Sequence, residues 1–277
     1  MEFKKKYKIK PKEIRKNGVI IFTDGTNEMM PNQETCLAYG YEFQDGICRA
    51  FTPSLVIEKK ERSKGVTQVG SNNVSSSRNS QVIGESNKIT ESNNSLVSGE
   101  ANVIDRGVNN SVVVGKMGRS THTNELCIGG GGFNSEAGLL QYSVLQVSGK
   151  TTSGSNVDLY INGDNVINKE ITLPTNSVIL YEIFLSALCT GGTRGTAGEY
   201  ISYQWIGAVR SDNEGVMTNT ITINRTLGSD GRGLGSYSII VTTPTIFRIR
   251  VSGQTDVNTQ WHAVVKLHIN KTNAVEI

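Results

Sequence analysis

The chain has 277 residues, of which 36% are hydrophobic, 19% are charged and 6% are aromatic, with 30 glycines and five prolines. This composition suits an all-β protein of many short strands and turns, and the length allows one or two domains. No stretch approaches 18 consecutive apolar residues, and the start of the chain leads into lysines rather than an apolar segment. We therefore expect neither insertion into a membrane nor a secretory signal.

The net charge of +3 is unevenly distributed. Residues 1–16 hold eight Lys or Arg and two Glu, whereas the rest of the chain holds 20 Lys or Arg and 23 Asp or Glu. Such an arm binds nucleic acid or an acidic surface, or is a solvated tail that becomes ordered on docking. We predict docking to an acidic protein partner and expect no nucleic acid. The predicted attachment residues are Lys4, Lys5, Lys6, Lys8, Lys10, Lys12, Arg15 and Lys16.

Residues 17–64 predict a small N-terminal attachment module followed by a connector. Residues 18–22 are strand-like, residues 24–25 form an Asp-Gly turn, and residues 54–64 are rich in charge. Cys36 and Cys48 either form a disulfide in an oxidising medium or remain buried thiols. The four cysteines include no Cys-x-x-Cys pair, so we expect no metal site and no cofactor.

One pattern recurs five times between residues 65 and 129. Its glycines are spaced 14, 15, 16 and 14 residues apart, and they are Gly70, Gly84, Gly99, Gly115 and Gly129. Five residues before each of the last four glycines stands an asparagine: Asn79, Asn94, Asn110 and Asn124. Three residues after a glycine a second asparagine recurs, at Asn73, Asn87 and Asn102. A short fixed period predicts a β-solenoid, with glycine and asparagine at the corners and asparagines hydrogen-bonded along the stack.

The interior of each coil is small, and this predicts that three rolls pack together. The expected core residues of the roll or of the trimer are Val82, Val97, Val113 and Ile128, and Cys127 is expected in the apolar slot of the fifth repeat. So few aliphatic side chains do not offset the ordering of the backbone, and we therefore predict a homotrimer. The alternative is a disordered Asn- and Ser-rich linker, but linkers do not keep a constant phase through five repeats. The repeat region is expected to end in a Gly-rich hinge, giving a shaft of residues 65–138.

Residues 139–277 predict a C-terminal β-sandwich of the jelly-roll type. Apolar and polar residues alternate with a period of two, as at Val157, Leu159 and Ile161, and the segment gives about nine strands. Binding residues concentrate in loops between strands. The Gly-rich loop 228–235 is therefore the candidate distal binding loop, with Asp230 and Arg232 as its candidate residues.

The sequence offers no clear catalytic arrangement. The histidines His122, His262 and His268 lie in no recognisable nucleophile context. Sugar cleavage needs two carboxyl groups in a groove, and most of the available acids lie at expected turns. These acids are Asp158, Asp164, Glu170, Asp212, Glu214 and Asp230. We therefore predict no catalytic residue and a protein that is not an enzyme.

Two motifs resemble known families. The rhythm Asn-Ser-x-Val-x-Gly-x-x-Asn-x-Ile resembles the head repeats of YadA-like trimeric autotransporter adhesins, which form trimeric left-handed β-rolls, and similar repeats occur in bacteriophage fibres. The Cys…Ala-Tyr-Gly-Tyr…Cys-Arg-Ala-Phe arrangement of residues 36–51 resembles short N-terminal modules on virion proteins of crAss-like phages. The first resemblance covers about 65 residues and is specific for architecture rather than for a partner.

These resemblances imply a short homotrimeric fibre of a tailed-phage virion, assembled in the host cytoplasm and most simply a head (capsid) fibre. The alternatives are a tail or baseplate fibre that acts as a receptor-binding protein, and a bacterial trimeric surface adhesin. An adhesin of that family is expected to carry an export signal and a membrane barrel. The implied partners are two further copies of the chain, a capsid or tail protein at the N-terminus, and a host-surface glycan or protein at the C-terminal domain.

Overall fold

A computed structural model describes residues 6–15, 18–44, 46–50, 65–132, 136–163, 170–230, 233–242 and 244–273. The chain divides into two compact units, Met1–Glu58 and Lys59–Ile277, which are described separately. Within the described ranges, no helix is long and apolar enough to span a membrane. The predicted charged connector at residues 54–64 lies outside the described residues.

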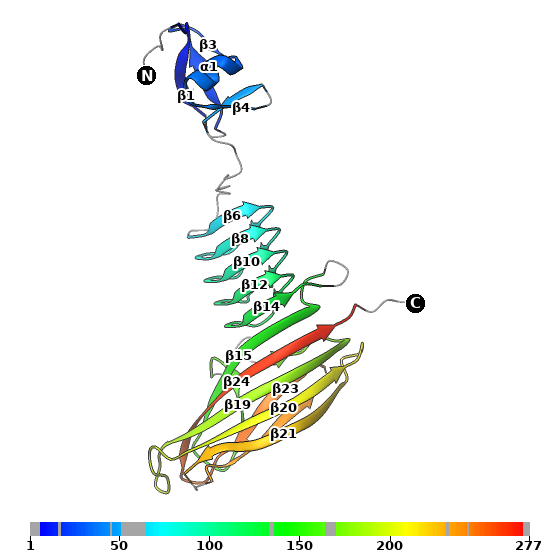
Figure 1. The fold of residues 1–277 in the computed structure, drawn as a ribbon. Helices are drawn as coiled ribbons and strands as arrows, with labels where there is room; N and C mark the ends of the chain where they lie inside the picture. Colours follow the sequence, from blue (N-terminus) through cyan, green and yellow to red (C-terminus); the bar gives the residue numbers. More distant parts are fainter. Residues whose placement is uncertain are drawn as a thin grey trace. The chain divides into compact units, whose positions relative to one another are not determined.

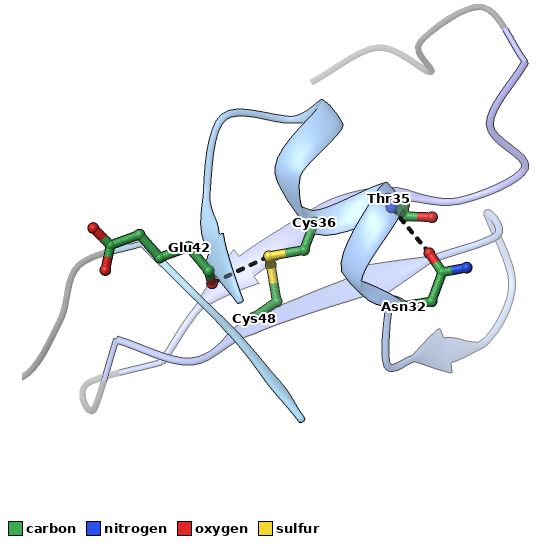
Figure 2. Close-up of a disulfide and its surroundings, with 5 residues drawn as sticks. All are labelled: Asn32, Thr35, Cys36, Glu42 and Cys48. Atoms are coloured by element: carbon green, nitrogen blue, oxygen red, sulfur yellow. Dashed lines mark hydrogen bonds between the residues drawn. A yellow bond between two sulfur atoms is a disulfide. The ribbon is translucent and has the colours of Figure 1, made fainter. Parts of the chain in front are cut away.

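The first unit is a small module built around a disulfide. Its strands β1 (Lys10–Ile14), β2 (Ile20–Thr23) and β3 (Glu28–Met29) form an antiparallel sheet, followed by helix α1 (Gln33–Ala38) and the hairpin of β4 (Glu42–Gln44) and β5 (Ile47–Arg49). Asn32 caps α1 by accepting the Thr35 N–H (Figure 2). The structure pairs Cys36 with Cys48, and both are buried with Ile20 and Phe22. Because this core is so small, the cross-link contributes on the order of 2–4 kcal/mol to its stability.

Part of the predicted basic arm, residues 10–14, is a strand of the N-terminal module. Its residues 10–14 form strand β1, which pairs with β2, so the expectation of a segment without regular structure is wrong there. The reason is that Pro11 is buried and Ile9 packs against the module core, which draws the segment into the fold. The structure thus joins part of the predicted arm to the predicted module.

In the second unit, residues 65–130 form the predicted β-solenoid. Its long strands are parallel and stack in chain order, as Figure 1 shows: β6 (Thr67–Ser71), β8 (Gln81–Glu85), β10 (Leu96–Glu100), β12 (Val112–Lys116) and β14 (Leu126–Gly130). Short strands form a second parallel sheet, in the order β13 (Arg119–Ser120), β11 (Val103–Ile104), β9 (Lys88–Ile89) and β7 (Val74–Ser75). The register places the five marker glycines opposite one another.

Glycine is required as the fourth residue of β6, β8, β10 and β12 for two reasons. Gly70, Gly84, Gly99 and Gly115 have φ between 92° and 125°, which L side chains rarely adopt. A Cβ at Gly84 would also lie 2.0 Å from the carbonyl oxygen of Gly99 in the next coil, so the coils approach too closely for any side chain. Gly129 is not in this region of φ, because the chain leaves the solenoid there.

The interior of the solenoid is a short column of apolar side chains. Val82, Val97, Val113 and Cys127 are in register and fully buried, and Ile89, Ile104 and Val108 complete the cluster. Ile128, expected in the core of the roll or of the trimer, does not lie in the roll interior, because its side chain is 42% exposed, so only the trimer alternative remains for it. Counting back from the glycine, Cys127 occupies the position of Val82 and Val97, whereas Ile128 occupies that of Ile83 and Ser98.

The long-strand sheet of the solenoid continues into the C-terminal domain. Strand β14 pairs antiparallel with β15 (Leu140–Thr151), and the sheet continues through β24 (Asn258–Lys271), β19 (Ser177–Gly191), β20 (Tyr200–Ser211) and β21 (Met217–Ser229). Gly129 and Gly130 belong to β14 and not to a hinge, since β14 continues the sheet as far as Gly130. The solenoid and the C-terminal domain therefore share a sheet of eleven strands (Figure 1).

A smaller sheet completes the C-terminal domain. Its strand β23 (Ile246–Ser252) pairs with β16 (Asn156–Asp158), β18 (Ile171–Thr172) and β22 (Ser236–Thr242), while β17 (Tyr160–Ile161) pairs with β15. One core between the sheets includes Tyr181, Trp205, Phe247 and Trp261. The predicted jelly-roll order is not found: β19, β20 and β21 are consecutive neighbours in one sheet, whereas a jelly roll is built from two Greek keys.

Candidate functional site

Two asparagine ladders run along the solenoid, and the buried one makes more hydrogen bonds. Asn79 donates to Asn94 over 3.4 Å and Asn94 donates to Asn110 over 3.2 Å, both on the surface, whereas Asn124 bonds to Asn162 of the C-terminal domain. All four of these asparagines have φ between 51° and 61°, as corner residues do.

The buried ladder consists of Asn73, Asn87 and Asn102. The Nδ2 of Asn87 donates to Asn73 Oδ1 and to the carbonyl oxygens of Ile83 and Gly99, over 2.8–3.1 Å. Asn102 repeats these bonds one coil further on, and its Oδ1 accepts the Gly118 N–H. These side chains therefore satisfy backbone groups at the corners, which would otherwise be buried without partners.

The fifth coil departs from the repeat at two interior positions. One position holds Ser80, Ser95 and Ser111 in earlier coils and Glu125 in the last, and the other holds Ser77, Ser92 and Val108 and then His122. Both replacements are buried. They line a partly open pocket of about 180 Å³, to which the C-terminal domain contributes Leu173, Leu267 and Lys271.

His122 and Glu125 connect the last coil to the small sheet. The Thr172 N–H donates to His122 Nε2 over 2.9 Å, and His122 Nδ1 lies 3.6 Å from Glu125 Oε2. Glu125 Oε2 also accepts the Ser120 hydroxyl and the N–H groups of Thr121 and His122. The Thr172 hydroxyl is 3.1 Å from Nε2, but the backbone N–H occupies the lone pair that a general base needs. The arrangement is therefore a structural connection rather than a hydrolytic triad.

We expect Glu125→Gln to remove an acid-sensitive part of the stability. Burial raises the pKa of this carboxyl, but the hydrogen bond with His122 and the further hydrogen bonds, including that of the Thr121 N–H, outweigh burial and lower it below its usual value. A lowered pKa stabilises the fold above the unfolded value of about 4.3, and the contribution disappears as the pH falls through the folded value. Thermal melting should thus show the variant less stable at pH 7, with the difference shrinking below about pH 4.3. A difference that stays constant from pH 7 to pH 3 contradicts this role.

Cys127, which follows Glu125 by two residues and belongs to the apolar column of the solenoid, is not a reactive thiol. Burial, followed by the nearby Glu125 charge, raises its pKa to about 12. A thiol reacts mainly as the thiolate, so Cys127 acts as a small apolar side chain. Among the residues described, no three His, Cys, Asp or Glu side chains are placed to hold a metal ion.

An open groove of about 740 Å³ lies at one end of β15 and β24. Its polar and aromatic lining includes Ser148, Lys150, Asp158, Tyr160, Asn162, Gln260 and His262. Asp158 is fixed there by Arg250 at 2.6 Å, and Arg248 reaches Glu170 at 2.6 Å and Asp158 at 3.9 Å. Two of the acids considered for sugar cleavage are thus engaged by guanidinium groups on the small sheet.

The other predicted site residues are not brought together. Asp212 accepts the N–H groups of Glu214 and Val216 in a turn, and Asp230 accepts the Tyr200 N–H over 2.8 Å. Asp164 and Arg232 lie outside the described residues, so the candidate distal loop is described only in part. The sequence did not predict the open groove, because its lining comes from β15, β16 and β24, which are distant in the chain and are brought together by the strand pairing.

The predicted attachment residues divide into three groups. Lys4, Lys5 and Lys16 lie outside the described residues, and Lys6 and Lys8 are exposed. On β1 and just after it, Lys10 is half-buried, Lys12 lies 2.8 Å from Glu28, and Arg15 lies 3.5 Å from the same carboxylate. The positive charge of the segment is therefore partly neutralised within the module.

No protein-family model and no curated protein matches this chain. Among solved structures, the chain is similar to the tailspike protein of Acinetobacter phage vB_ApiP_P1 at 9% identity (TM-score 0.28, 75% of this chain and 46% of that chain). It is also similar to the tailspike protein of Acinetobacter baumannii phage AM24 at 8% identity (TM-score 0.26, 76% of this chain and 56% of that chain). A third is tailspike protein gp49 of Acinetobacter baumannii bacteriophage Fri1, at 10% identity (TM-score 0.26, 75% of this chain and 44% of that chain).

The chain spans about half the length of these three tailspikes. The Fri1 protein is a capsular polysaccharide depolymerase, and this finding overturns the sequence-based exclusion of enzymes, which rested on histidines without a nucleophile context and on acids at expected turns. Similarity at this level identifies no catalytic residue in the present chain. The solved structures are tail proteins, and none of them bears on the expected head position.

Proposed function

We propose that the chain is a short homotrimeric fibre of a tailed-phage virion, with left-handed rolls, that attaches through its N-terminal module and presents its C-terminal domain to the host surface. A head (capsid) fibre is the preferred position, and a tail or baseplate fibre that acts as a receptor-binding protein is the alternative. The proposed partners are a capsid or tail protein and a host-surface glycan or protein.

The observation that carries this proposal is the direct pairing of β14 with β15. A stack of parallel coils is stiff along its axis, because each coil is hydrogen-bonded to the next over its full long strand. Since the last coil pairs with the C-terminal sheet, the stack holds that domain without a flexible linker. A stiff spacer that ends in a compact domain with an open polar groove suits the display of a binding surface.

Immunogold electron microscopy of purified virus particles tests the proposal, with one antibody against residues 139–277 and another against residues 18–44. The C-terminal antibody should label intact particles, over the capsid for a head fibre and at the tail for the alternative. The N-terminal antibody should label only disrupted particles, because its epitope is covered at the attachment point. Particles that contain the protein and bind neither antibody when intact would contradict the proposed display.

A further inference from the structure

We infer that one face of the eleven-stranded sheet, the outer face, is the contact surface for two further copies of this chain in parallel and in register. The inference rests on the proposed trimer for the number of copies, and it adds the surface through which they meet. The outer face consists of two rows of residues that follow the strand register. The first row is Thr67, Gln81, Leu96, Val112, Leu126, Val144, Lys266, Glu182, Ile206 and Ile223. The second row is Val69, Ile83, Ser98, Val114, Ile128, Tyr142, His268, Leu180, Ala208 and Thr220.

The outer face is apolar although it is accessible in the single chain. None of its twenty residues is buried, and the side chains of Val69, Ile83, Leu126, Ile128 and Leu180 are 39–54% exposed. The row between the two, by contrast, points inward and holds buried residues such as Val97, Cys127 and Tyr181. The apolar side chains run without a break from β6 to β15, Lys266 and His268 interrupt them on β24, and apolar side chains return on β19 and β20. Single exposed apolar side chains are ordinary, but a band that continues across six neighbouring strands marks an interaction surface.

Charge is almost absent from this face and present on the others. Within the two rows the charged pair is Glu182 and Lys266, whose side chains lie 2.9 Å apart and neutralise each other. Charged residues instead stand at the ends of the long strands β8, β10 and β12, which are Glu85, Glu100 and Lys116. The short-strand sheet also carries charge, at Lys88 and Arg119. Depletion of charge is what distinguishes the centre of a protein interface from its surroundings.

The geometry of the rows favours another copy as the occupant. The rows repeat with the coil spacing of about 4.8 Å and continue without a break from β14 to β15. A rotation axis parallel to the stack keeps each coil at the same height in every copy, so Ile83 meets Ile83 and Ile128 meets Ile128 along the full length. The same register places Lys266 of each copy at the level of the other copies' Lys266, and Glu182, 2.9 Å from the lysine in its own chain, compensates that charge.

The test combines native mass measurement of the full chain with site-directed cross-linking. The purified protein should have three times the 30.0 kDa mass of the chain. Ser98→Cys, on the outer face, should react with a short bismaleimide to give covalent dimers and trimers. Lys88→Cys, one coil away on the short-strand sheet, is the matched control and should give less than a tenth of that product.

A second variant tests the same face without cross-linking. Ile83→Arg combined with Ile128→Arg should convert the trimer to monomer while the far-ultraviolet circular dichroism of the β-structure persists, whereas Lys88→Glu should leave the trimer intact. A monomeric or dimeric wild-type protein overturns both the inference and the trimer of the proposed function. A trimer in which Ser98→Cys does not cross-link overturns the inference alone, and a trimer absent from virus particles overturns the proposed function alone.

Discussion

Val97→Asp is expected to prevent folding of the solenoid. Val97 is fully buried, and its neighbours in the column are Val82 and Val113, so the carboxylate would find no partner. An unpaired buried charge costs at least about 4 kcal/mol, a large share of the roughly 5–15 kcal/mol that stabilises a typical protein. Since each coil is a template for the next, a disrupted third coil also removes the support of its neighbours.

The measurement is thermal melting of the purified variant by circular dichroism, together with its soluble yield. The melting temperature should fall by about 10 °C or more, or no soluble protein should form. The control is Lys88→Glu, an exposed change in the neighbouring coil, which should alter stability by less than about 0.5 kcal/mol. Unchanged melting of Val97→Asp would show that the assigned interior row is wrong.

Asn102→Ala is expected to destabilise the stack through unsatisfied backbone groups. The substitution leaves the carbonyl oxygens of Ser98 and Gly115 without the Nδ2 donor, and the Gly118 N–H without the Oδ1 acceptor. Each buried group that loses its partner costs about 1–3 kcal/mol, so the total loss is about 3 kcal/mol or more. Asn102 is fully buried, and water cannot replace these bonds without opening the coil.

Urea unfolding compares this variant with Asn94→Gly on the surface ladder. Glycine keeps the φ of 55° at position 94, and water replaces the two lost hydrogen bonds, to Asn79 and to Asn110, so that variant should lose less than about 1 kcal/mol. Equal losses in the two variants would mean that the buried ladder has no special role.

The repeat period predicted the solenoid and its register because both follow from local residue types. Glycine at a fixed spacing identifies the corners, and the corners fix which residues of each coil share a level. The sequence left open whether Ile128 belongs to the roll or to the trimer core, because residues 126–128 are three consecutive apolar residues and alternation alone does not select among them. Counting two residues back from Gly129 selects Cys127, as it selects Val97 before Gly99.

The replacement of Ser111 by Glu125, and of Val108 by His122, was also visible in the aligned repeats. Thr172, the hydrogen-bond partner of His122, could not be predicted from the repeats, because it lies 50 residues from His122 in the chain. The sequence also did not predict the order of strands in the C-terminal domain. Alternation gives the two faces of a strand but not its neighbours, so neither the pairing of β14 with β15 nor the contact of Arg250 with Asp158 follows from it.

The solenoid has two different ends, and this gives the stack a direction. Its C-terminal end is covered by β15 and tied down by His122, whereas no described strand pairs with the far edge of β6. A linear array of hydrogen-bonded units loses order first at its uncovered end. We therefore expect local opening to begin at β6 and proceed toward β14, which hydrogen exchange of the coil amides would show as protection that rises from β6 to β14.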